Sequence, residues 1–362
     1  MSDLVDGLDG VVAARTVLSE VDGAAGRLLI RGYSLDHLVG QVSYEEVVAR
    51  LWAGFFDPLP IDLAAALGRA RCEVFEEVSA LDRRLVRHSP VEVMRALTAR
   101  LADGDSVETA LRLVAAPAVF TAAAVRAQLG APPIAPDPDL GHAEDSLRMI
   151  RGERASQAEV AALDAYLVTV IDHGLNASTF AARVVASTHA GLTSAVLAGI
   201  SALKGPLHGG APGPVIEMLD GVGAPENAQA WLEAAVDRGD RLMGFGHRIY
   251  QVRDPRADAL KGVIKALAKA EGASLGRLAL AEAVEAAALA LLAQRKPGRS
   301  LATNVELYTA LLLEALEFPP GAFTCVFAMG RCAGWIAHAR EQVASGRLMR
   351  PQSVYVGPRL AA

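Results

Sequence analysis

The 362-residue chain has little cysteine and no excess of basic side chains, which excludes several classes of protein. Its three cysteines, Cys72, Cys325 and Cys332, cannot all pair and form no CxxC motif, so neither a disulfide framework nor a zinc knuckle is indicated. Lysine and arginine number 35 against 41 acidic residues, and a net charge of -6 leaves no general basic field for nucleic acid. We therefore expect a protein of the reducing cytoplasm that has no nucleic-acid partner and binds anions only at local sites.

The sequence also lacks segments that direct a protein to export or to a membrane. Residues 1–15 carry Asp3, Asp6 and Asp9 in place of the basic start and apolar core of a signal peptide. Residues 184–203 contain no charge, but they are too polar and too rich in glycine to face lipid. The small side chains of this stretch predict a buried helix at an interface between domains or subunits. We expect neither export nor contact with a membrane.

Short motifs of nucleotide, metal and serine-hydrolase sites are missing. The sequence has no GxxxxGK[ST] loop, and the GFG triplet at residues 244–246 lacks the third glycine and the preceding strand of a dinucleotide-binding fold. HExxH, GxSxG and EF-hand patterns are absent as well. We therefore expect chemistry based on histidine, arginine and carboxylate side chains, without a bound metal.

Helix-forming residues dominate most of the chain, with apolar positions three and four residues apart, as in residues 163–171. The pattern predicts helices over residues 36–56, 90–101, 108–128, 157–173, 227–238, 255–270, 278–294 and 308–316. Short, partly β-branched segments at residues 11–21 and 27–33 predict one small N-terminal β-hairpin, because Asp22-Gly23 lies between them. No regular alternation of strands and helices follows, so we expect an all-α fold and no parallel sheet.

Two clusters of glycine and proline, at residues 205–214 and 296–298, divide the chain. They bracket roughly ninety residues, a common size for a small domain. The proline-rich segment at residues 131–139 is short enough to be an ordinary loop between helices. We therefore expect hinge-like boundaries at the two clusters.

Two histidines lie among glycines, in segments that cannot continue a helix. Residues 204–211 read KGPLHGGA around His208, and residues 244–248 read GFGHR around His247. Unhindered backbone N–H groups beside an imidazole can bind an anion. A surface loop histidine is the alternative for either residue alone, but the repetition favours a functional site.

Residues 172–178, DHGLNAS, end one helix and begin the next. Asn176 or Ser178 is expected to cap the second helix, because both residue types accept hydrogen bonds from the first free N–H groups. His173 then ends the first helix. A structural cation at that helix end is the alternative to a ligand-binding role for His173.

Charged residues at four later positions are further candidates. The DPR triplet puts Arg256 in the first turn of a helix, where the dipole disfavours a cation, so Arg256 faces either an anion or a nearby aspartate. Glu306 lies just ahead of a helix, where capping is the alternative role. Arg331 lies in an apolar run that should be buried, so this arginine must be paired. Arg350 lies in a terminal loop, where a solvated charge is the alternative.

Together these segments resemble the citrate synthase family, along nearly the whole chain. The specific blocks are DHxLNASTF at residues 172–180, KGPLHGGA at 204–211, GFGHR with a following DPR at 244–256, and RLxRP at 347–351. The resemblance implies an all-α homodimer, with a large helical domain at residues 1–207 and 311–362 and a small mobile domain at residues 208–310. It also implies condensation of acetyl-CoA with oxaloacetate, then hydrolysis of the citryl thioester, with no tightly bound cofactor and no metal.

The resemblance further implies roles for the candidate residues. His208 is expected to donate to the thioester carbonyl, His247 to bind the ketone of oxaloacetate, and Glu306 to act as the base. The substrate carboxylates are expected to be held by His173, Arg256, Arg331 and, from the other subunit, Arg350. The expected contacts with coenzyme A are Leu242, Met243, Gly244, Phe245, Gly246, Arg248, Arg253, Lys296 and Arg299. This set fits the chemistry, since a weakly acidic thioester methyl group needs a placed carboxylate and donors for the enolate oxygen.

Three positions differ from the usual family pattern. Glu306 stands where the family has aspartate, Gly174 where it has glutamate, and Pro212-Gly213 where it has Asn-Glu. Two alternatives therefore stay open. One is synthesis of 2-methylcitrate from propionyl-CoA, and the other is a non-catalytic protein of the same fold that senses a ligand or binds a partner.

Overall fold

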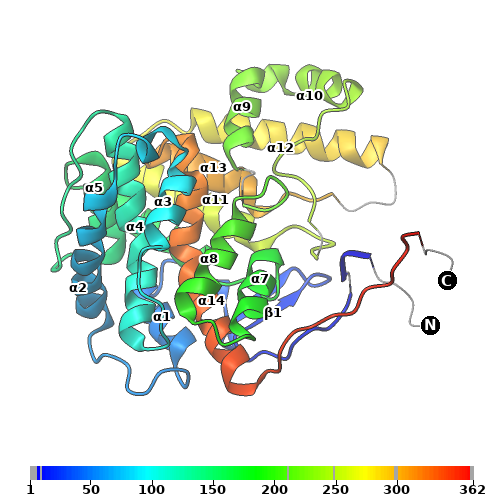
Figure 1. Ribbon diagram of the computed structural model, residues 1–362. Coiled ribbons are helices and arrows are strands. Elements are labelled where there is room, and N and C mark those ends of the chain that lie inside the picture. Colours follow the sequence, from blue (N-terminus) through cyan, green and yellow to red (C-terminus); the bar gives the residue numbers. More distant parts are fainter. Residues whose placement is uncertain (1–5, 9, 210–211, 248, 297–300, 359–362) are drawn as a thin grey trace.

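The computed structural model describes residues 6–8, 10–209, 212–247, 249–296 and 301–358, and these residues are largely helical (Figure 1). Within them lie fourteen α-helices and one small antiparallel sheet. The all-α fold with a small N-terminal β element, predicted from the sequence, is therefore confirmed.

Helices α4 (Val107–Gln128) and α14 (Phe323–Ser345) form the centre of the larger part of the molecule. Around them pack α1 (Tyr44–Trp52), α2 (Leu63–Phe75), α3 (Pro90–Thr98), α5 (His142–Arg151), α6 (Gln157–Val170), α7 (Ala177–Ala186) and α8 (Leu192–Leu203). Helix α4 is long and apolar enough to cross a membrane, but 83% of its apolar window is buried in the fold. Core packing therefore accounts for its composition.

A second group of helices stands beside this core, with α9, α10 and α12 farthest from α4 in Figure 1. The group comprises α9 (Pro212–Val222), α10 (Ala228–Asp237), α11 (Pro255–Glu271), α12 (Gly276–Arg295) and α13 (Val305–Ala315). Helix α10 packs on α12, and α9 packs on α13. Helix α11 joins the group to the core, because it packs on both α13 and α6.

The sheet consists of β1 (Ser19–Asp22), β2 (Arg27–Ile30) and β3 (Tyr33–Ser34), in that order and antiparallel. The predicted hairpin is present, but its first strand begins at Ser19 instead of residue 11, and a third short strand follows. Short 3₁₀ helices complete the fold: η1 (Asp6–Leu8), η2 (Leu35–His37), η3 (Glu76–Ala80), η4 (Leu85–Arg87), η5 (Pro225–Asn227) and η6 (Pro320–Ala322).

Two predicted helices differ from the structure. The helix expected from residue 36 begins only at Tyr44, because Ser43 and Glu46 form a reciprocal capping box that fixes its start. The single helix expected at residues 184–203 is divided between α7 and α8, and His189 and Gly191 in the intervening turn have φ of 60° and 94°. The other predicted helices are present with shifted ends, and α2, α5, α9 and α14 are additional to them.

The small side chains of α8 do allow close packing, as expected. A Cβ atom at Gly199 would lie 2.6 Å from the ring of Trp335, so this ring of α14 packs directly on the backbone of α8. A glycine also allows α14 to pack closely on the segment that ends α6. A Cβ atom at Gly334 would lie 2.2 Å from the carbonyl oxygen of Ile171.

Candidate active site

The loop before α11 and the start of α13 are held together by backbone hydrogen bonds. The N–H of Gly246 donates to the carbonyl of Ala302 at 2.8 Å, and the N–H of Asn304 donates to the carbonyl of Gly244 at 3.0 Å. Gly244 and Gly246 have φ of 87° and 83°, a region that favours glycine. These contacts place the loop that carries His247 beside the helix end that carries Glu306.

His247 has a fixed acceptor nitrogen. Its Nδ1 atom accepts the backbone N–H groups of Ile249 and Tyr250 at 3.0 and 3.1 Å. Burial and the nearby positive charge of Arg256 lower the pKa of His247 to about 4. The neutral ring therefore carries its proton on Nε2, where it can donate a hydrogen bond.

His173 lies against the same loop. Its ring centroid is 5.4 Å from that of His247, and its Nε2 atom is 3.1 Å from the hydroxyl of Tyr250. Burial, with the charge of Arg256, lowers the pKa of His173 well below its usual value. The left-handed φ of 60° at the next residue, Gly174, suits glycine at the position where the family pattern has glutamate.

His208 approaches from the turn after α8. Its Nε2 atom is 2.8 Å from the hydroxyl of Ser178, which also accepts the indole N–H of Trp335 at 3.2 Å. Burial, reinforced by the charges of Arg331 and Arg256, lowers the pKa of His208 to about 4. The two arginines therefore favour the neutral form of the His208 ring.

The two arginines are buried and differ in their partners. Arg256 binds the carboxylate of Asp254 through Nε and Nη2 at 3.1 and 2.8 Å, so the aspartate alternative is present in the structure. Arg331 donates from Nε to the carbonyl of Val170 at 2.6 Å, but its buried Nη2 has no hydrogen-bond partner in the described part of the chain. Burial lowers the pKa of Arg331 to about 10. An unsatisfied guanidinium donor in such a place suits a carboxylate ligand.

Glu306 occupies the first turn of α13, but it is not the cap of that helix. Asn304 is the N-cap, and its side chain accepts the N–H of Glu306 at 2.9 Å. Burial raises the pKa of Glu306 to about 7, although Arg241, Asn304 and Arg256 act in the opposite direction. A carboxyl group with that pKa can take up or release a proton near neutral pH.

The remaining expected residues differ in where they lie. Arg350 is exposed in the segment after α14, and Lys296 is exposed at the end of α12. Arg253 forms ion pairs with Asp258 and Glu285, so its guanidinium is already engaged. Leu242, Met243 and Phe245 do lie in the loop before His247, with Leu242 and Phe245 buried. Arg248 and Arg299 lie outside the described residues.

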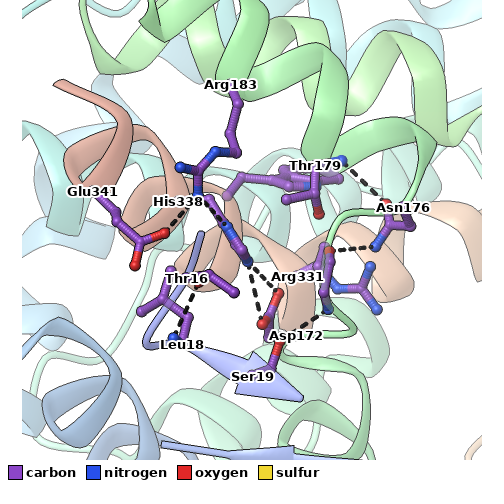
Figure 2. A network of polar contacts seen from close by, with 12 residues as sticks. Thr16, Leu18, Ser19, Asp172, Asn176, Thr179, Arg183, Arg331, His338 and Glu341 are labelled. Atoms are coloured by element: carbon purple, nitrogen blue, oxygen red, sulfur yellow. Dashed lines mark hydrogen bonds and ion pairs between the residues drawn. The ribbon is translucent and has the colours of Figure 1, made fainter. Parts of the chain in front are cut away.

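A buried polar network supports the turn that carries His173 (Figure 2). His338 has its Nε2 atom 3.1 Å from Oδ1 of Asp172 and its Nδ1 atom 2.9 Å from the guanidinium of Arg183. Arg183 also pairs with Glu341 at 2.6 Å. Burial alone would raise the pKa of Asp172. The opposing effects of His338, Arg331 and Ser19 are larger, so the pKa lies below its usual value. No local sequence pattern links these residues, since Asp172 and His338 are 166 positions apart.

Comparisons with known proteins show the family of this chain. The family model described as citrate synthase, C-terminal domain, matches residues 7–352. A protein of Mycobacterium tuberculosis named putative citrate synthase 2 is 37% identical over 98% of this chain and 94% of its own. A 2-methylcitrate synthase from the same species is 35% identical over 98% and 91%. The citrate synthase of Thermoplasma acidophilum, solved as a ternary complex with carboxymethyl coenzyme A and oxaloacetate, is 27% identical, with a TM-score of 0.84 over 99% of this chain and 98% of that one. The chain belongs to the citrate synthase family and is an enzyme of the citrate synthase type.

Proposed function

We propose that this enzyme condenses acetyl-CoA with oxaloacetate and hydrolyses the resulting citryl thioester to citrate and CoA. This proposal rests mainly on the groups that the fold brings together. They are three neutral histidines, two buried arginines and the carboxyl group of Glu306, whose pKa is raised to about 7. The solved relative that holds oxaloacetate and a coenzyme A analogue supports these substrates.

Oxaloacetate is a dicarboxylate with a ketone, and the site offers a partner for each part. The open donor of Arg331, with Arg256 and His173, would hold the carboxylates and fix their orientation. The Nε2 proton of His247 would bind the ketone oxygen, because Nδ1 of that ring is occupied by backbone donors. The same donor would stabilise the alkoxide that forms when the new carbon–carbon bond closes.

Acetyl-CoA would be activated by Glu306 and His208. The ionised carboxylate of Glu306 removes a proton from the methyl group, and the enolate carbon then attacks the ketone carbon of oxaloacetate. His208 must donate to the enolate oxygen from Nδ1, so its Nε2 atom must accept the single hydroxyl proton of Ser178. In the structure that hydroxyl donates to Oδ1 of Asn176 at 2.8 Å, so its proton must turn towards His208 in the reaction. The proton that Glu306 takes from the methyl group balances the proton that the alkoxide takes up. Water then cleaves the citryl thioester, giving the new carboxylate of citrate and the thiol of CoA.

The residues of the proposed site come from both groups of helices. His173 and Arg331 belong to the core, whereas His247, Arg256 and Glu306 belong to the group from α9 to α13. We propose a large domain of residues 1–207 and 311–362 and a small domain of residues 208–310, which oxaloacetate draws together. The boundary at residue 310 falls within α13, so the last residues of that helix, 311–315, belong to the large domain. We further propose a cytoplasmic homodimer in which Arg350 completes the partner's site.

A steady-state assay of CoA thiol release tests the proposed reaction. We expect release that requires oxaloacetate, with kcat/KM for acetyl-CoA at least about tenfold above that for propionyl-CoA, since one methylene changes discrimination by about 10- to 200-fold. A higher kcat/KM for propionyl-CoA would support 2-methylcitrate synthesis, which the 35% identical relative keeps open. No release from either thioester would contradict both reactions, and no observation favours a non-catalytic role.

The pH dependence of the reaction should report Glu306. Its pKa of about 7 means that the base is protonated, and therefore inactive, at lower pH. We expect kcat/KM for acetyl-CoA to rise about tenfold per pH unit up to about pH 7 and then to level off. His208 and His247, with pKa values of about 4, stay neutral over this range. A flat profile between about pH 5.5 and 8 would contradict the role of Glu306.

A further inference from the structure

The hairpin formed by β1 and β2 contacts both loops that carry the substrate-binding histidines. On one side, the hydroxyl of Ser19 accepts the N–H of Gly174, the residue after His173, at 3.0 Å. On the other side, the carbonyl of Gly23 accepts the N–H of Gln251 at 2.9 Å. This short sheet therefore links a loop of the core to a loop of the second helix group.

The turn of the hairpin fits against residues 249–253 only because glycine stands at positions 23 and 26. A Cβ atom at Gly23 would lie 2.1 Å from the carbonyl oxygen of Ile249, although ordinary contacts begin at 3.4 Å. A Cβ atom at Gly26 would lie 2.8 Å from Cγ2 of Val252. Gly26 has a left-handed φ of 63°, so a side chain there would be strained in any surroundings, and glycine at this position is not evidence for close packing alone. Gly23 has no such φ, so close approach alone requires glycine there.

The backbone that touches Gly23 also holds the ring of His247. Ile249, whose carbonyl meets Gly23, donates its N–H to Nδ1 of His247 at 3.0 Å. The next residue, Tyr250, adds a second N–H at 3.1 Å, and its hydroxyl lies 3.1 Å from Nε2 of His173. A shift of this backbone would therefore move both histidines.

We propose that the hairpin is a positioning element of the active site, in which Gly23 sets the loop of His247 and Ser19 sets the turn of His173. Neither residue is expected to touch the substrate. Their effect reaches oxaloacetate through the histidines, so this inference rests on the proposed function. Gly23 and Ser19 are then positioning residues of the site, although they lie far in the sequence from its motifs.

The substitution Gly23→Ala tests the proposal. The added methyl group forces the loop at Ile249 to retreat by about 1 Å, and a displacement of that size can cost about 100-fold in rate. We expect kcat/KM for oxaloacetate to fall about 10- to 100-fold and the Kd of oxaloacetate, measured by calorimetry, to rise at least about fivefold. The KM for acetyl-CoA, determined at saturating oxaloacetate, should change less than about threefold.

Gly262→Ala is the matched control. It adds the same methyl group in the exposed part of α11, where nothing lies within 4 Å of a built Cβ atom. This variant should bind oxaloacetate as the wild type does.

A second pair of variants keeps the proposal testable if Gly23→Ala fails to fold. Ser19→Ala removes both the acceptor of the Gly174 N–H and the hydrogen bond to Asp172, on either side of His173, and should raise the Kd of oxaloacetate about three- to tenfold. Ser19→Thr retains the hydroxyl and should restore binding, which a merely structural loss at β1 does not predict. Wild-type binding of oxaloacetate with unchanged Kd in Gly23→Ala and Ser19→Ala overturns the positioning role alone. Failure of the wild type to bind oxaloacetate overturns the proposed function, and the positioning role with it.

Discussion

Replacing Glu306 by glutamine is expected to lower kcat about 100- to 10,000-fold, the usual contribution of a general base. Glutamine keeps the shape of the side chain, but its amide cannot take the proton of the acetyl methyl group. Exchange of the methyl protons of acetyl-CoA with deuterated water isolates this step when malate, a dicarboxylate without the ketone, replaces oxaloacetate. We expect that exchange to disappear together with condensation.

Two controls separate loss of the base from loss of the site. The Kd of oxaloacetate should stay within about threefold of the wild-type value, because its expected ligands are His173, His247 and the arginines. Glu306→Asp keeps a carboxylate, so it should retain exchange, with kcat altered by up to about 100-fold in either direction, depending on how the loop fits the shorter side chain. Undiminished condensation by Glu306→Gln would refute the role and leave Glu306 as a carboxylate at a helix end.

Stability gives an independent check that Glu306→Gln is folded. The pKa of Glu306 in the folded chain, about 7, exceeds the value of about 4.3 of an unperturbed glutamate. The folded state therefore holds the proton more tightly, and this group's contribution to stability falls as pH rises from about 4 to 7. Glutamine has no such loss, so the melting temperature of the variant at pH 8 should equal or exceed that of the wild type.

The sequence predicts the parts of the site that carry local signals. Glycines around His208 and His247 mark loops that a ligand can approach, and both rings are half-buried near the charge of Arg256. The cap at Asn176 and the helix start at Asp254 follow the same local rules and are confirmed. The roles of these residues in catalysis stay predictions.

The interactions that hold these residues are not visible in the sequence. His338 binds Asp172 across 166 positions, and Ser19 binds Gly174 across 155 positions. Such pairs depend on how α14 and the hairpin dock, which no local periodicity specifies. The sequence also does not predict the break between α7 and α8. Uncharged small residues continue through it, and it depends on the positive φ of His189 and Gly191.

Mixing two inactive variants, Arg350→Ala and His247→Ala, is expected to restore activity if Arg350 completes the partner's site. Within this chain, Arg350 lies in the exposed segment after α14, and Figure 1 shows that segment leaving the helices beside the N-terminal one. Three apolar residues farther along it are also exposed: Val354 at 73%, Tyr355 at 65% and Val356 at 92%. Exposed apolar side chains of this kind suit packing against a second copy of the chain.

The activity expected of the mixture depends on whether Arg350 acts in its own chain's site or in the partner's site. If Arg350 acts in the partner's site, a heterodimer has one site with both native residues and one site with neither. Random exchange makes half of the dimers mixed, so activity should recover to about a quarter of the wild-type value. If Arg350 acts in its own chain, every site lacks one residue and no activity returns. Heterodimers purified through two different affinity tags, and assayed for CoA release, decide between these outcomes, because they should show about half of the wild-type activity in the first case and none in the second. The test requires that each variant alone is inactive and remains dimeric.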